Sequence, residues 1–243
     1  LVLAERALKG NIDQDAIQKL REMATAHADE TRRLRALWCL HAIDEVDSEI
    51  AEKLINDQSE YLRAWTVQLL AENATVASNR RNEELLINLA VRERSLLVRQ
   101  YLASATGRLS KLAAWTILEQ LASQSDNAGD RNLPLAIWHQ LAQRMASDLP
   151  RALALADSTK IPALKNYILW YAPQLSATGR DAIAERLVNS TGKERVQLLS
   201  LFSAGLQGMR GLQQPKAWTA IANTLYDSTD ASTRQAAQNL GAA

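Results

Sequence analysis

Six stretches of this 243-residue chain begin alike, and this repetition limits the possible folds more than any single residue does. Three of them place an aliphatic residue before an arginine and continue as an apolar run at helical spacing, beginning at Leu34, Leu62 and Val98. Weaker copies begin at Leu133, Ile161 and Glu194. Successive copies are about 28–36 residues apart, a period typical of proteins that stack pairs of helices. The sequence therefore predicts an α-solenoid.

The composition supports helices along the whole chain. Apolar residues make up 47%, with only 9 glycines, 5 prolines and one phenylalanine. Four prolines fall at expected turns or first helical turns, where the missing N–H is harmless, while Pro173 should kink or end its helix. No segment alternates as a strand does. We predict an all-α superhelix of about six to seven helical pairs, forming one continuous domain over residues 1–243.

Apolar periodicity, capping residues and glycines set the expected helix boundaries. The expected helices are 1–9, 15–28, 31–43, 48–56, 60–72, 82–91, 95–109, 111–123, one from about 132, 148–157, 161–175, 179–189, 193–207, 215–226 and 232–240. The loops between them, at 73–81, 124–131, 176–178 and 208–214, are polar but not long proline- or serine-rich linkers. Because the chain opens at Leu1 without a signal-peptide pattern, we interpret it as a fragment of a longer protein.

Charge and motifs exclude several classes of function. The net charge is +1, from 28 basic and 27 acidic residues, so the sequence does not predict a nucleic-acid binder. No apolar stretch is long enough for membrane insertion. Cys39, the only cysteine, can form neither an intrachain disulfide nor a cysteine zinc site. The histidines His27, His41 and His139 are not spaced as metal ligands, and no common catalytic or nucleotide-binding motif occurs. We predict no catalytic residue, cofactor or metal.

Three arginines, Arg35, Arg63 and Arg99, open the second helices of successive repeats. Residues at one position in stacked units form a ladder, and two interpretations are open. The ladder could bind a partner's acidic loops or phosphates. Alternatively, each arginine could bridge to an acid in a neighbouring loop, such as Asp29 or Asp57, and hold the stack. We favour the second interpretation and keep the three arginines as a possible partner-binding ladder.

The six tryptophans fall about one to a repeat, at positions 38, 65, 115, 138, 170 and 218. We predict that each is wedged between helix pairs, because each keeps helical spacing with aliphatic residues. On this interpretation Trp38→Ala and Trp138→Ala should each cost about 3–5 kcal/mol. The alternative is an exposed surface on which bases or sugars stack.

The amino-acid sequence of these stretches resembles that of HEAT repeats. The segments 34–40, 62–67, 98–105 and especially 130–138 look like the helical middle region of large bacterial membrane-bound dehydrogenase proteins. Those proteins combine a glucose/sorbosone-dehydrogenase-like β-propeller, a HEAT array and a c-type haem domain. The resemblance covers residues 15–175. The family's haem attachment needs two cysteines and this chain has one, so no catalytic residue of the family maps here.

The resemblance implies a cellular location and a role for the chain. It implies an exported bacterial protein of the periplasm or cell envelope, in which this chain is a non-catalytic scaffold between an oxidising domain and its electron acceptor. The expected partners are the flanking propeller and cytochrome c domains. Two alternatives stay open: a nucleic-acid-binding HEAT protein similar to a DNA glycosylase, and a stand-alone peptide-binding adaptor.

Overall fold

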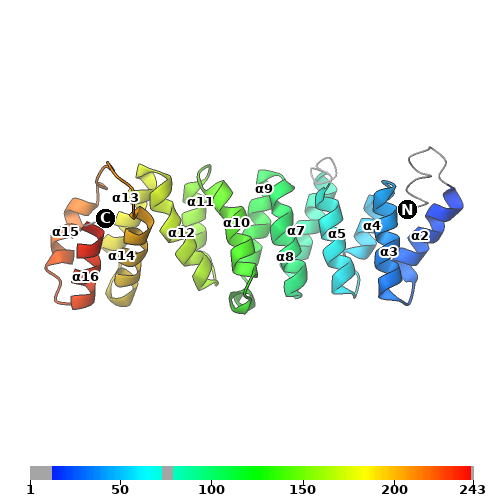
Figure 1. Ribbon diagram of the computed structural model, residues 1–243, viewed down its shortest axis with the longest axis horizontal. Coiled ribbons are helices and arrows are strands. Elements are labelled where there is room, and N and C mark those ends of the chain that lie inside the picture. Colours follow the sequence, from blue (N-terminus) through cyan, green and yellow to red (C-terminus); the bar gives the residue numbers. More distant parts are fainter. Residues whose placement is uncertain (1–12, 73–78, 242–243) are drawn as a thin grey trace. The chain divides into compact units, whose positions relative to one another are not determined.

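The computed structural model describes residues 13–72 and 79–241, which form α-helices, two short 3-10 segments and no β-strand (Figure 1). The helices are α2 (Gln14–Ala26), α3 (Glu30–Ala42), α4 (Ser48–Leu54), α5 (Glu60–Glu72), α7 (Arg80–Arg92), α8 (Leu96–Ala105), α9 (Lys111–Ala122), α10 (Leu133–Met145), α11 (Leu149–Ser158), α12 (Pro162–Leu175), α13 (Ala177–Asn189), α14 (Gly192–Leu206), α15 (Trp218–Tyr226) and α16 (Ala231–Gly241). The predicted all-α class is confirmed. The helix predicted at 1–9 and most of the loop at 73–81 lie outside the described residues.

The boundaries fall within a few residues of prediction because side chains cap the helices. Asp29 precedes α3, and its carboxylate accepts hydrogen bonds from the backbone N–H groups of Thr31 at 2.8 Å and Arg32 at 3.2 Å. Ser95 precedes α8 in the same way. α12 runs through Pro173 but ends at Leu175, so the proline lies in the last turn of the helix, as its missing N–H predicts.

The chain divides into two compact units, which are described separately. Unit 1 comprises residues 1–121 and 129–137, and unit 2 comprises 122–128 and 138–243. The prediction of one continuous domain is not tested by this division.

Each unit stacks helix pairs in the same way. In unit 1, α2 packs on α3, α4 on α5 and α7 on α8, while the second helices α3, α5 and α8 also contact one another in turn. In unit 2, α11 packs on α12, α13 on α14 and α15 on α16, and the second helices α12, α14 and α16 contact in turn. The second helix of each pair therefore packs beside the second helix of the next pair within the unit, which is the packing of a helical-repeat array.

The tryptophans do not share one environment. Trp115 is fully buried, as predicted for a ring wedged between helices. Trp38 is 39% exposed, so the predicted wedge is wrong at this position. The reason is its place on α3: its neighbours Leu37 and Leu40 take the buried side, together with Ile17 and Leu62 of the core. Trp38 is left on the open side of the helix.

We therefore expect Trp38→Ala to lower the free energy of unfolding by only about 1–2 kcal/mol, because the ring loses mainly one aromatic contact. Urea titration followed by circular dichroism measures this change. Trp115→Ala is the comparison, and its loss should be clearly larger since it leaves a cavity. Equal losses in the two variants would mean that Trp38 is a core residue after all.

Candidate interaction surface

The arginines that occupy equivalent positions in the structure are not the three that the sequence predicted. The backbone N–H of Arg63 donates to the carbonyl of Ser59, four residues earlier, and the N–H of Arg99 donates in the same way to the carbonyl of Ser95. These bonds close the first turn of α5 and α8. In α3 that position belongs to Arg33, and Arg35 lies two residues further along. Arg35, Arg63 and Arg99 are therefore not equivalent, because the repeat at Leu34 begins later relative to its helix start than the other two.

The arginine at this position anchors the chain just before its own helix. Arg33 Nε donates to the carbonyl of Ala24 at 3.0 Å, and Arg63 Nη1 donates to the carbonyl of Asp57 at 2.7 Å. In unit 2 the same position holds Arg180, Arg195 and Arg234, which donate to the carbonyls of Pro173, Ser190 and Ser228. Carbonyls at the end of a helix lack partners within the helix. The repeated arginine supplies such partners. Arg33, Arg63, Arg195 and Arg234 connect the two helices of one pair, whereas Arg180 of α13 connects its helix to α12 of the preceding pair.

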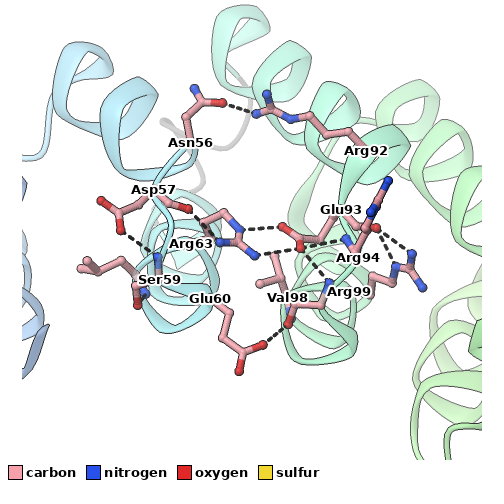
Figure 2. Close-up of polar contacts among 12 residues, drawn as sticks. Asn56, Asp57, Ser59, Glu60, Arg63, Arg92, Glu93, Arg94, Val98 and Arg99 are labelled. Carbon is pink, nitrogen blue, oxygen red and sulfur yellow. Dashed lines mark hydrogen bonds and ion pairs between the residues drawn. The ribbon is translucent and has the colours of Figure 1, made fainter.

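Glu93 is the centre of the polar network in unit 1 (Figure 2). Its carboxylate accepts from Arg63 Nε at 2.7 Å and Nη2 at 2.9 Å, and from the backbone N–H groups of Arg94 at 2.9 Å and Ser95 at 2.8 Å. Its backbone carbonyl accepts from Arg99 Nε at 2.9 Å. Glu93 therefore joins the second helix of one pair to both helices of the next.

Burial and hydrogen bonding act on Glu93 in opposite directions. The residue is only 5% exposed. This burial raises the pKa of its carboxyl, but the hydrogen bonds from Arg63 and from the Ser95 and Arg94 amides lower it, and the net pKa lies below its ordinary value. The carboxylate is thus ionised at neutral pH despite its burial.

The three arginines of the predicted ladder differ in what they present to solvent. Arg99 is 4% exposed, Arg63 is half-buried in its ion pair with Glu93, and Arg35 is exposed. Arg33, at the equivalent position in α3, pairs with Asp57. The bridging interpretation thus fits the geometry at Arg63 and Arg33, while a partner-binding role for Arg35, Arg63 and Arg99 stays a prediction.

The lowered pKa of Glu93 predicts how stability depends on pH. Because the folded-state pKa is below the unfolded value of about 4.3, the unfolded chain binds more protons between the two values. The stabilisation is present above the unfolded pKa and is lost as pH falls through the folded pKa. Urea titrations between pH 7 and pH 3 should show a steeper loss of stability for the wild type than for Glu93→Gln. Parallel pH profiles would contradict the role given to this carboxylate.

The second helices of unit 1 also carry an aromatic face, defined here as Trp38, Tyr61, Trp65 and Tyr101. Trp38 and Tyr61 are 39% and 49% exposed. The ring centroids of Trp38 and Trp65 are 4.9 Å apart at 72°, and those of Trp65 and Tyr101 are 6.3 Å apart at 59°. Since α3, α5 and α8 lie side by side (Figure 1), the rings continue from one repeat to the next.

A hollow of about 420 Å³ lies beside this face, between α5 and α8. It is lined by Trp65, Gln68, Glu72, Gln100, Tyr101 and Ser104. The Glu72 carboxylate accepts a hydrogen bond from Gln68 Nε2 at 3.1 Å and lies 3.1 Å from His41 Nε2. Gln100 Nε2 donates to Asp130 at 3.3 Å.

The sequence favoured buried tryptophans and left an exposed aromatic surface as the alternative, although a signal for this face was present. Trp65 and Tyr101 each follow the repeated arginine by two residues. Two residues along a helix lead to a different side, so an arginine that faces the preceding loop places the aromatic ring elsewhere. In unit 2, Trp138 and Tyr167 have ring centroids 5.5 Å apart, which is a second cluster of the same kind.

Other predicted candidates are dispersed. His27 ends α2, and its Nδ1 accepts from the backbone N–H of Asp29 at 2.9 Å, while Cys39 is a half-buried free thiol and His139 is exposed. Over residues 13–72 and 79–241, three or more histidine, cysteine, aspartate and glutamate side chains nowhere gather as they would around a metal ion. No helix in the same ranges has the length and hydropathy of a membrane span.

In comparisons with known proteins, no family model, curated protein or solved structure matches this chain.

Proposed function

We propose that this chain is a non-catalytic interaction scaffold that binds a protein partner through the aromatic face of unit 1. The observation that supports this most is the exposure of Trp38, in ring contact with Trp65, and of Tyr61, about one helical turn before Trp65 on α5. Contiguous exposed apolar patches mark interaction sites, and tryptophan and tyrosine are enriched in protein interfaces.

The residue types of the face favour a protein partner. Tryptophan, tyrosine and arginine dominate the binding energy of protein interfaces, and Arg35 is an exposed arginine on α3, the helix that carries Trp38. The ion pair between Arg63 of α5 and Glu93 supports the proposal indirectly, since it helps to fix the spacing between α5 and α8, which carry Trp65 and Tyr101.

The resemblance of residues 15–175 to dehydrogenase-associated HEAT arrays suggests which partners to test. On that basis we propose a bacterial, periplasmic or cell-envelope scaffold that holds a β-propeller oxidising domain at a fixed distance from a c-type haem domain. The propeller and the haem domain would bring the redox chemistry.

The binding experiment uses Trp38→Ala combined with Tyr61→Ala. Titration calorimetry measures binding of the chain to a purified propeller domain and a purified c-type haem domain from a bacterial protein of the resembled class. We expect the double variant to weaken binding of one domain about tenfold or more, because the removed rings are exposed anchors. Leu112→Ala, which trims an exposed residue of α9, is the matched control and should bind as the wild type does. Unchanged affinity in the double variant would reject the aromatic face as the docking surface.

The non-catalytic part of the proposal has its own test. The purified chain is assayed for oxidation of sugars and alcohols with quinone or cytochrome c as electron acceptor. We expect no turnover above the background without protein. Detectable turnover that follows the chain through purification would reject a pure scaffold.

A further inference from the structure

The hollow between α5 and α8 has an uneven charge. Among the described residues that line it, Glu72 is the only aspartate, glutamate, lysine or arginine, and its carboxylate is partly exposed. The group that pairs with it, His41, is charged only when protonated. No lysine or arginine of residues 13–72 and 79–241 lines the hollow. Its electrostatics therefore favour a cation and disfavour a phosphate.

The two rings of the hollow add to this preference. Trp65 and Tyr101 line it from adjacent helices, with centroids 6.3 Å apart and planes inclined by 59°. The face of an aromatic ring attracts a cation within about 6 Å, and tryptophan does so best. Two inclined rings beside a carboxylate are an arrangement suited to an organic cation.

The side-chain amides complete the set of acceptors. Gln68 uses its N–H to bind Glu72, and Gln100 uses its N–H to bind Asp130. Neither side-chain carbonyl oxygen accepts a hydrogen bond from the residues that the structure describes, so both stay open to a ligand. With the Glu72 carboxylate this makes three groups that accept hydrogen bonds. An ammonium group has three N–H donors and no acceptor.

We propose that the hollow binds the side chain of a lysine carried by an extended segment of the protein partner. This inference rests on the proposed function, because the same aromatic face would hold the segment on either side of that lysine. The lysine stem lies against Trp65 and Tyr101, and the ammonium group is directed to Glu72. A nucleic acid is disfavoured here, since Glu72 would repel its phosphates.

The test uses peptides as probes. An acetylated and amidated heptapeptide of alternating alanine and lysine is titrated into the chain, and tryptophan fluorescence follows binding. A second peptide replaces every lysine with glutamine. We expect the glutamine peptide to bind about tenfold more weakly, with the lysine peptide losing affinity as salt rises. Equal affinities for the two peptides would overturn the proposal.

Two variants locate the binding. Glu72→Gln removes the charge but keeps an acceptor for Gln68, and we expect it to weaken lysine-peptide binding about fivefold or more. Glu49→Gln, on α4, changes an exposed acid that does not line the hollow and should leave affinity unchanged. Tyr101→Leu removes one ring and should weaken binding as well. Wild-type affinity in Glu72→Gln overturns the lysine site.

The two proposals can fail separately. If Trp38→Ala with Tyr61→Ala weakens binding of a partner domain while Glu72→Gln binds the lysine peptide as the wild type does, the docking face stands and the lysine site is rejected. If neither set of variants changes binding, both proposals are rejected.

Discussion

Gly179→Ala is expected to destabilise unit 2 by about 3 kcal/mol or more. A Cβ atom at position 179 would lie 2.0 Å from the carbonyl oxygen of Ala172 and 2.8 Å from its carbonyl carbon, far inside the closest approach seen for real Cβ atoms. These are backbone atoms of α12 and cannot rotate away, so α13 would have to shift from its neighbour. Forced overpacking costs about 1–3 kcal/mol, and more when backbone must move.

The sign of this effect makes the experiment decisive. Position 179 lies in the first turn of α13, where alanine favours the helix over glycine by about 1 kcal/mol. Without the close contact the substitution should therefore stabilise the protein. Gly129→Ala is the matched control, because nothing lies within 4 Å of its added Cβ. Urea titration measures both variants, and a Gly179→Ala protein as stable as the wild type would show that α12 and α13 are further apart than described.

The same end of α12 has a second close approach. A Cβ at Gly205 of α14 would lie 2.4 Å from the Trp170 carbonyl oxygen and 3.1 Å from the Pro173 side chain. Two glycines from different helices thus meet the last turn of α12. Because they permit the helices to approach this closely, they set the packing of this part of unit 2.

The order and the ends of the helices could be predicted from the sequence because the signals are local. Asp29 and Ser95 cap α3 and α8 through residues two and three positions along the chain, so the boundaries need no tertiary information. The register of the arginines could not be predicted in this way. The aliphatic-arginine pair at Leu34 matches the pairs at Leu62 and Val98 in sequence, yet Arg33 holds the structural position.

The candidate site was harder to predict than the fold. Whether a tryptophan is buried depends on which side of its helix meets the next pair, and helical spacing alone suits both Trp115 and Trp38. The sequence did not indicate that Glu93 is buried either. It lies between Arg92 and Arg94, as a charged residue of a solvent-exposed loop would. Its burial arises from Arg63, thirty residues earlier in the chain, which only the stacking of helix pairs brings within 2.7 Å.

Glu93→Ala is expected to lower the free energy of unfolding of unit 1 by about 3–5 kcal/mol, because removing one member of a buried ion pair leaves the other charge without a partner. Arg63 is half-buried and would keep its bond to the Asp57 carbonyl but lose both bonds to the carboxylate. The Arg94 and Ser95 amides would lose their acceptor as well. Urea titration of the purified variant measures the loss.

A double-mutant cycle separates the pair from its surroundings. Arg63→Met, Glu93→Ala and the combination are compared with the wild type, and the pair should show a coupling energy of about 1–3 kcal/mol. The combined variant should therefore lose less stability than the sum of the single variants, since it no longer buries an unpaired charge. Arg81→Met with Glu52→Ala, an exposed ion pair between α7 and α4, is the matched control and should show a coupling of about 0–1 kcal/mol. Equal couplings at the two sites would mean that the Glu93 network does not hold neighbouring helix pairs together.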